Sequence, residues 1–192
     1  MKAVFLDRDG VLNDPVADPV NGGPPESPYR PEDVRLSSGA VDGARRLREA
    51  GYALVVVTNQ PAAAKGTATV QALDAVSGRV RGLLADAGVE LDGWYTCLHH
   101  PEGTVAGLAG ACDCRKPAPG LLLRAADELG LDLGASWIVG DSDSDVEAGR
   151  RAGTRTVLVA HPGSAHRRAG ATAADHQVDD LDDAAQAILR LR

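Results

Sequence analysis

Short runs of apolar residues alternate along the chain with longer segments in which apolar residues recur every three or four positions. The short runs are rich in β-branched residues and are bounded by Gly, Asp or Asn, as expected of strands that are buried on both faces. The predicted strands are residues 3–6, 53–57, 137–139 and 156–160, with 94–96 as a weaker candidate. Such strands belong in the interior of a sheet that is covered on both sides.

The longer segments have the periodicity of amphipathic helices, and most of them stop at a glycine, which readily adopts the left-handed conformation that ends a helix. The predicted helices are residues 40–50, 70–87, 119–129, 145–152 and 182–191. Ser144 and Asp145 are candidate N-caps of the fourth helix. The alternation of strands and helices predicts an α/β fold, a three-layer, Rossmann-like doubly wound parallel sheet with helices on both faces.

Three segments have no such pattern. Residues 14–31 are rich in Pro, Gly and Asp and are predicted to form a loop, and residues 97–114 hold all three cysteines and two histidines. The segment 161–177 is rich in Ala, His, Arg and Gly and indicates no particular role. Because the chain has neither an internal repeat nor a long linker, we expect residues 1–192 to form one domain.

Composition narrows the functional classes. Of the 192 residues, 44% are apolar and 24% are charged, which is ordinary for a globular protein. The net charge of −7 argues against nucleic acid as a partner, because such binding depends on neutralising phosphates. The longest apolar run, residues 52–57, is too short to cross a bilayer, and the chain does not begin with a signal-peptide pattern. We therefore expect a soluble cytoplasmic protein that acts without a membrane.

An acidic loop, Asp7-Arg8-Asp9-Gly10, directly follows the first predicted strand. In an open α/β sheet, ligands bind beyond the carboxyl ends of the strands. One carboxylate here can hold a hard cation and attack as a nucleophile, while the other can act as general acid and then as base. A solvated Asp-Gly turn is the alternative interpretation.

Other predicted strands end in residues whose chemistry matches this loop. Thr58 and Asn59 offer a hydroxyl and an amide after the second strand, and Asp141 can complete an oxygen-rich Mg²⁺ site with Asp7. Lys116 adds a positive charge just before the third predicted helix. A metal, a carboxylate nucleophile, polar donors and a cation together suit phosphoryl transfer.

The order of these motifs resembles the haloacid dehalogenase superfamily of phosphatases: Asp7-x-Asp9-Gly10, then Thr58, then Lys116, then Gly140-Asp141-x-x-x-Asp145. Receiver domains use a similar set of groups, but their phosphorylated aspartate comes from a mid-chain strand and their lysine comes last. Here Lys116 precedes Asp141, which favours the phosphatase superfamily.

Residues 97–114 contain the ligand types of a zinc site. Three thiols and an imidazole suit tetrahedral Zn²⁺. The candidate ligands are Cys97, His99 or His100, Cys112 and Cys114. The alternatives are free thiols or a disulfide between the last two cysteines, which a cytoplasmic setting disfavours. Four protein ligands would leave no open position for water, so we expect the zinc to be structural.

The combination of Asp-Arg-Asp-Gly-Val-x-Asn, Thr-Asn-Gln, Cys-x-His-His-Pro-x-Gly and Cys-Asp-Cys-Arg-Lys-Pro-x-Pro-Gly is similar to that of the D-glycero-D-manno-heptose 1,7-bisphosphate 7-phosphatase family. The phosphatase domain of histidinol-phosphate phosphatases is a close sibling. The resemblance implies a Mg²⁺-dependent phosphatase with an aspartyl-phosphate intermediate, a structural Zn²⁺, no separate cap domain and a small phosphorylated sugar or amino-alcohol substrate. With an uncapped pocket, we expect the chain to work as a monomer.

The same resemblance assigns the site residues. Asp7 is the expected nucleophile and Asp9 the expected acid and base. Mg²⁺ would be held by the side chains of Asp7 and Asp141 and by the backbone carbonyl of Asp9. The residues expected to hold the phosphate or the rest of the substrate are Asn13, Thr58, Asn59, Lys116 and Arg115, the last at the remote phosphate or the sugar. The expected zinc ligands are Cys97, His99, Cys112 and Cys114.

The chain departs from the family pattern around the expected pocket, which loops 14–31, 61–66 and 97–114 would shape. Pro61 and Ala62 stand where the family has Ser-Gly, Lys65 replaces an Arg, and Ser142 follows Asp141 where Lys or Arg is frequent. Lys65 keeps the positive charge but loses the bidentate fork of Arg. These departures concern the substrate rather than the chemistry.

Two alternatives therefore accompany the heptose bisphosphate interpretation. Histidinol phosphate or another small phosphate ester would fit the altered loop, with Glu26, Glu32 or Glu102 facing a cationic substrate. A non-catalytic phosphate-binding or zinc-stabilised module would lack the nucleophile or the acid, and both Asp7 and Asp9 are present.

Overall fold

The computed structural model describes residues 1–17, 22–170 and 173–191, and its six strands form one sheet in the order β3-β2-β1-β4-β5-β6. All neighbouring pairs are parallel. The strands are β1 (Ala3–Leu6), β2 (Ala53–Asn59), β3 (Gly93–Cys97), β4 (Trp137–Gly140), β5 (Arg155–Val159) and β6 (His176–Val178). Residues 18–21 of the predicted loop 14–31, residues 171–172 of segment 161–177, and residue 192 lie outside the described part.

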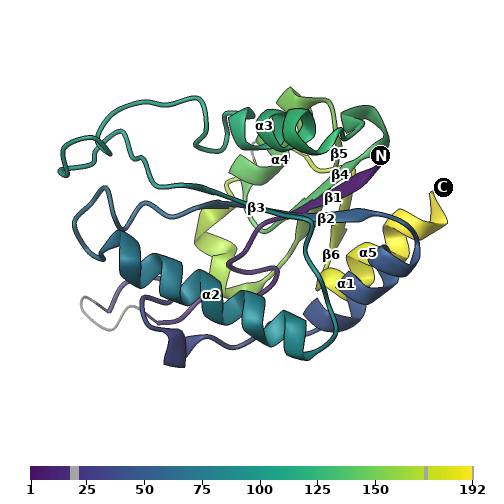
Figure 1. The fold of residues 1–192 in the computed structure, drawn as a ribbon, viewed down its shortest axis with the longest axis horizontal. Helices are drawn as coiled ribbons and strands as arrows, with labels where there is room; N and C mark the ends of the chain where they lie inside the picture. The colour runs from purple at the N-terminus through teal and green to yellow at the C-terminus, as the bar shows by residue number, and fades with distance from the viewer. Residues whose placement is uncertain (18–21, 171–172, 192) are drawn as a thin grey trace.

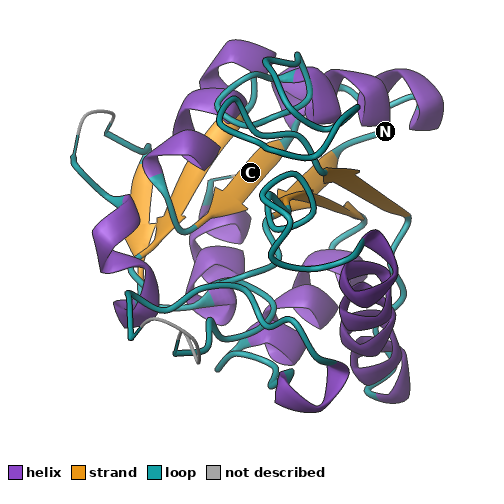
Figure 2. Cartoon of the chain, turned by 90° about the vertical axis from the view of Figure 1, so that its left-hand side faces the viewer, coloured by secondary structure: helices purple, strands orange, loops and turns teal. Residues whose placement is uncertain are grey.

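Helices cover both faces of this sheet, as Figures 1 and 2 show. The α-helices are α1 (Ala40–Glu49), α2 (Val70–Asp86), α3 (Gly120–Leu129), α4 (Asp143–Ala152) and α5 (Leu181–Arg190). Short 3₁₀-helices are η1 (Pro31–Asp33), η2 (Leu133–Ala135) and η3 (Pro162–Arg167). One apolar core lies between the sheet and α1, α2 and α5, and a second lies between the sheet and α3 and α4. The predicted three-layer α/β fold is confirmed.

The central strand β1 shows why the sheet needs both layers. All four of its residues are buried, and because side chains alternate in a strand, Val4 and Leu6 enter one core while Ala3 and Phe5 enter the other. The strand ends at Leu6, and Asp7 follows it directly. The position of β1 between β2 and β4 places the carboxyl ends of these three strands side by side.

Two details differ from the predicted elements. Helix α4 begins at Asp143, two residues earlier than expected, because Ser142 is its N-cap and Asp145 at the third helical position accepts a hydrogen bond from the Ser142 backbone. Strand β6 was not expected, since its three residues lie at the sheet edge and lack an apolar run. No helix among the described residues is long and apolar enough to cross a bilayer.

Candidate active site

A cavity of about 510 Å³ opens at the carboxyl ends of β1, β2 and β4. Its volume is in the range of small-molecule sites in proteins. Asp7, Lys116 and Asp145 line it close to the sheet, while Ser27 of the predicted loop 14–31 and Arg167 of η3 line it from other segments. Residues far apart in the chain therefore share one pocket.

Asp7 and Lys116 form a buried ion pair at this point. The Lys116 Nζ donates to Asp7 Oδ1 at 2.8 Å and to the carbonyl of Val57 at 2.7 Å, and it also pairs with Asp145. Burial alone would lower the pKa of Lys116, but Asp145 and Asp7 raise it, so the ammonium stays charged. Burial raises the pKa of Asp7 to about 6, a rise that Lys116 opposes and that Asp145 and Asp9 increase.

Asp141 completes a cluster of buried carboxylates. One oxygen from each of Asp7, Asp141 and Asp145 lies within 4.8 Å of the others. The Oδ1 atom of Asp141 is buried and has no hydrogen-bond partner among the described residues, while Ser164 donates to its Oδ2 atom. Burial and the two neighbouring carboxylates raise the pKa of Asp141 well above its usual value. Clustered carboxylates with an unpartnered oxygen fit a divalent cation that prefers oxygen ligands, such as Mg²⁺.

Gly10 allows the acidic loop to approach Asp141. Its φ is +90°, a conformation that residues with side chains rarely adopt, and an added Cβ would lie 2.0 Å from Asp141 Oδ2. Any side chain at this position would collide with the carboxylate cluster.

Asp9 is held by four side chains from three parts of the chain. Arg8, itself fully buried, contacts both carboxylate oxygens of Asp9 at 2.9 and 3.0 Å. Asn13, Ser27 and Gln60 each donate a further hydrogen bond at 2.7–2.9 Å. Burial would raise the pKa of Asp9, but the Arg8 charge and these hydrogen bonds together lower it. Asp9 is therefore ionised in this arrangement.

The polar groups of three expected phosphate-binding residues are hydrogen-bonded within the protein. Asn13 is fully buried and donates to Asp9. The hydroxyl oxygen of Thr58, also buried, accepts from Gln60 at 2.9 Å. Asn59 does border the cavity, but both ends of its amide bind the backbone of Lys116. A direct contact between these residues and phosphate stays a prediction.

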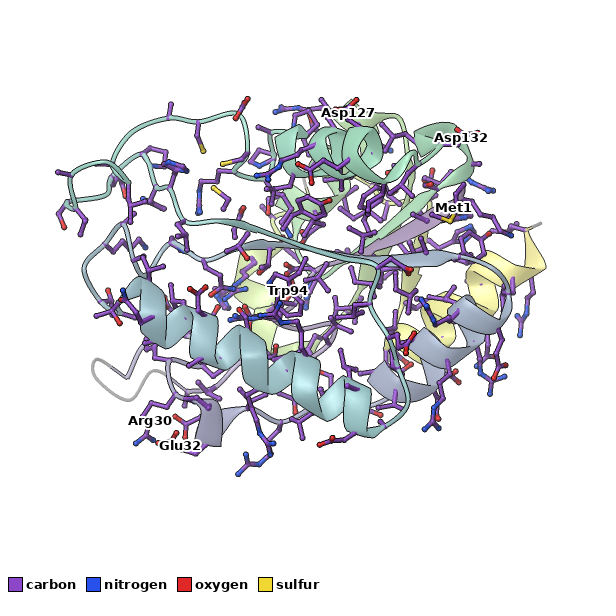
Figure 3. All side chains as sticks on the ribbon, viewed as in Figure 1. Met1, Arg30, Glu32, Trp94, Asp127 and Asp132 are labelled. Atoms are coloured by element: carbon purple, nitrogen blue, oxygen red, sulfur yellow. The ribbon has the colours of Figure 1, made fainter. Side chains whose placement is uncertain are left out.

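The four expected zinc ligands come together at the end of β3 and in the loop between β3 and α3, where sulfur atoms gather in Figure 3. The Sγ atom of Cys97 lies 3.7 Å from that of Cys112 and 3.1 Å from that of Cys114. The Nδ1 atom of His99 lies 3.9 Å from Cys97 Sγ and 3.5 Å from Cys114 Sγ. In a tetrahedral site with zinc–sulfur bonds of about 2.3 Å, the sulfurs lie about 3.8 Å apart, so the cluster can hold Zn²⁺ with a small adjustment.

The structure excludes the disulfide alternative and distinguishes between the two candidate histidines. All three cysteines are free, and Cys112 and Cys114 form no disulfide. His100 is outside the cluster, because its Nδ1 atom accepts a hydrogen bond from the Glu102 backbone at 3.1 Å. Burial raises the pKa of Cys97 and Cys114, so binding of Zn²⁺ by these thiols would displace their protons.

The cluster is tied to the cavity through Arg115, which directly follows Cys114 and precedes Lys116. Its guanidinium donates to the carbonyl of His99 at 3.3 Å, and the residue lines the cavity. The expected link between the zinc loop and the substrate pocket is thus present in the geometry.

Several residues of the site were not among those expected. Gln60 and Ser27 contact Asp9, Ser164 contacts Asp141, and His166 and Arg167 line the cavity. Gln60 has a sequence signal, since it is part of the Thr-Asn-Gln motif after the second predicted strand, but the other four lie in aperiodic segments. Only the fold shows that these segments reach the carboxyl ends of the strands.

Comparisons with known proteins identify a family model and two relatives that are similar to this chain. The HAD-hydrolase-like family model matches residues 113–184. The D-glycero-beta-D-manno-heptose-1,7-bisphosphate 7-phosphatases of Yersinia pestis and of Escherichia coli K12 are each 39% identical over 186 residues. These alignments cover 97% of this chain and 94% and 93% of the two relatives.

A solved structure is similar along its whole length. It is a D,D-heptose 1,7-bisphosphate phosphatase from B. bronchiseptica, complexed with magnesium and phosphate, with a TM-score of 0.80 and 28% identity. The match covers 100% of both chains. That protein therefore shares both the fold and the length of this chain.

Proposed function

We propose that this chain, which belongs to the haloacid dehalogenase-like family of phosphatases, removes the 7-phosphate from D-glycero-β-D-manno-heptose 1,7-bisphosphate. The observation that carries the proposal is the pocket of about 510 Å³ in which Asp7 and Lys116 lie together with Arg115. A nucleophile with a cation beside it serves the reacting phosphate, and a second cation can hold another anionic group of the same substrate.

Asp7 would attack phosphorus through a carboxylate oxygen while the bond between phosphorus and the sugar oxygen breaks. Lys116, 2.8 Å from Asp7, would stabilise the negative charge on the transferring phosphate oxygens. Its backbone is fixed by Asn59 and its ammonium by Asp145. These contacts hold the cation in place before substrate arrives, so little reorganisation is needed during the reaction.

Asp9 would give a proton to the leaving sugar oxygen and then take one from the water that hydrolyses the aspartyl-phosphate. The ionised Asp9 held by Arg8 suits the second half of this role. The negative charge of an arriving phosphate raises the pKa of a neighbouring carboxyl group, which favours the protonated state needed for the first half.

Two metals belong to this proposal. Asp7 and Asp141, with the backbone of Asp9, would hold Mg²⁺, which supplies charge neutralisation of the phosphate oxygens. The cluster of three cysteines and His99 would hold a structural Zn²⁺ that orders the loop leading to Arg115. We further propose that the enzyme acts as a monomeric, single-domain cytoplasmic protein, which light scattering and cell fractionation would test.

The decisive test compares kcat/KM with Mg²⁺ for both anomers of heptose 1,7-bisphosphate and for histidinol phosphate. Histidinol phosphate is the appropriate competitor because Glu26, a possible partner for its amine, lines the cavity. We expect the β-bisphosphate to be preferred by about 100-fold, equivalent to about 2.7 kcal/mol of transition-state discrimination. A preference for histidinol phosphate would overturn the substrate assignment, and no hydrolysis of any phosphate ester would overturn the activity.

A further inference from the structure

Three cations line the cavity without a carboxylate partner among the described residues: Lys65, Arg115 and Arg167. The acidic residues nearby are engaged elsewhere. Asp7 and Asp145 pair with Lys116, and Asp9 pairs with Arg8. Glu26 accepts a hydrogen bond from Tyr29 at 2.7 Å. The part of the pocket beyond the carboxylate cluster therefore has an excess of positive charge, which suits a second anionic group on the substrate.

Arg167 differs from the other arginines in this region. Arg115 donates to the carbonyl of His99, and Arg168 donates to the carbonyls of Asp141 and His161 at 3.1 and 3.0 Å. Arg167 is half-buried, and within residues 1–17, 22–170 and 173–191 its guanidinium has no hydrogen bond or ion pair. Its N–H donors are available to a ligand in the cavity that it lines.

The 3₁₀-helix η3, which carries Arg167, is hydrogen-bonded to Asp141. Ser164, which is fully buried, donates to Asp141, and Arg168 donates to the carbonyl of the same residue. The ring of His161 contacts Asp14 at 3.2 Å and accepts from the Gly163 backbone at 3.1 Å. These bonds fix η3 relative to the catalytic carboxylates, so the backbone that carries Arg167 is held in place at the wall of the cavity.

Arg167 also supplies a positive charge near Asp141, where the loop itself has none. The residue after Asp141 is Ser142, which caps α4, so this loop has no cation of its own. Arg167 is close enough for its charge to act on Asp141, where it lowers the pKa against the opposing effect of burial. A cation from η3 thus stands near the loop that would hold the metal and one end of the substrate.

We propose that Arg167 binds the phosphate of the substrate that is not hydrolysed, and that η3 is a specificity-determining wall of the pocket. The planar guanidinium can donate two parallel hydrogen bonds to a phosphate, which gives both affinity and orientation. This inference rests on the proposed bisphosphatase function, since it assigns a residue to the second phosphate of that substrate.

The test uses the metal-loaded full chain with two substrates that share the reacting phosphate, heptose 1,7-bisphosphate and heptose 7-phosphate. We expect Arg167→Gln to lower kcat/KM for the bisphosphate by about 30-fold, mainly through KM, and to change the value for the monophosphate by less than about threefold. Arg167→Lys should recover part of the loss, since it restores charge without the fork. Arg79→Gln, an exposed arginine on α2 outside the cavity, is the matched control.

An equal loss with both substrates would overturn the inference, because Arg167 would then serve the reacting phosphate or the fold. An unchanged kcat/KM with both substrates would overturn the inference as well. A second readout does not depend on bisphosphate turnover: competitive inhibition of p-nitrophenyl phosphate hydrolysis by mannose 1-phosphate. We expect the inhibition constant to rise about tenfold in Arg167→Gln, and an unchanged constant, or no inhibition of the wild type, counts against Arg167. Failure of the proposed function alone would appear as a wild-type enzyme that does not prefer the bisphosphate while the inhibition constant still rises.

Discussion

Asn59 and Lys116 exchange two hydrogen bonds: the Asn59 amide donates to the Lys116 carbonyl at 3.0 Å and accepts from the Lys116 backbone N–H at 3.1 Å. The carboxamide thus acts as a clamp that joins the end of β2 to the segment after the zinc cluster. It places the Lys116 ammonium against Asp7 although the two residues are 109 positions apart. Through this one side chain, the loop that holds the zinc cluster (residues 97–114) is connected to the nucleophile Asp7.

Replacement of Asn59 by Asp should lower kcat by about 10- to 100-fold, because a displacement of the order of 1 Å in a catalytic group has this effect. The carboxylate keeps the acceptor for the Lys116 N–H but lacks the donor for its carbonyl. Steady-state kinetics with p-nitrophenyl phosphate would measure the loss of kcat. The control is Gln71→Glu, at an exposed position on α2. An unchanged kcat would show that Lys116 is held without the clamp.

Asp7→Asn should abolish turnover and, in Mg²⁺-free buffer, make the protein more stable at neutral pH. The pKa of Asp7 is raised to about 6 in the fold, so the wild type loses stability as pH rises from about 4 through 6. Asparagine removes this loss, which is on the order of 2 kcal/mol after allowance for the Lys116 pair.

Urea unfolding at pH 4.5 and pH 7.5 would measure the effect. We expect the two proteins to be similar at the lower pH and the variant to be more stable at the higher one. Asp42→Asn, whose side chain is 71% exposed, should change neither value. A variant that is less stable at pH 7.5 would mean that the ionised Asp7 is fully compensated by its neighbours.

Arg8 and Asp9 should be energetically coupled. Loss of one member of a buried pair leaves an uncompensated charge, so Arg8→Met should lower the free energy of unfolding by about 3 kcal/mol. The double variant Arg8→Met with Asp9→Asn should be more stable than the sum of the two single effects predicts. Urea unfolding of all four proteins gives the coupling energy, and additive effects would exclude a buried ion pair as the source of stability.

Cys114→Ser should remove zinc and lower activity, because Arg115 and Lys116 follow this ligand directly. Elemental analysis should find about one zinc per chain in the wild type and close to none in the variant. His100→Asn should keep the zinc, since His100 lies outside the cluster. A variant that lacks zinc but retains full kcat would show that the loop is ordered without the metal.

Gly10→Ala should weaken Mg²⁺ binding, because the added Cβ would lie 2.0 Å from Asp141 Oδ2. Gly107→Ala is the matched control: it also has a positive φ, but no atom lies within 4 Å of its added Cβ. The control should lose only the conformational term of about 1 kcal/mol. Titration of activity with Mg²⁺ would compare the two, and equal metal dependence would contradict the proposed closeness of the acidic loop to Asp141.

The sequence alone predicted the layers of this protein and its principal chemical groups. The apolar runs of β1, β2 and β4 and the periodicity of α1 to α5 are local properties, because burial on both faces or on one helix face leaves a regular pattern. The ordered motifs from Asp7 to Asp145 and the cysteines of the zinc cluster could be found for the same reason, since each lies at a strand end or within one loop.

The tertiary structure decided how those groups are held. The contacts of Asp9 with Ser27 and Gln60, and of Asp141 with Ser164, join residues 18, 51 and 23 positions apart. Segments 14–31 and 161–177 have no periodicity, and in their described parts Ser27 and Ser164 bind polar groups of the site instead of packing on an apolar face. Which polar group meets which depends on the path of the chain above the sheet, and no local pattern records that path.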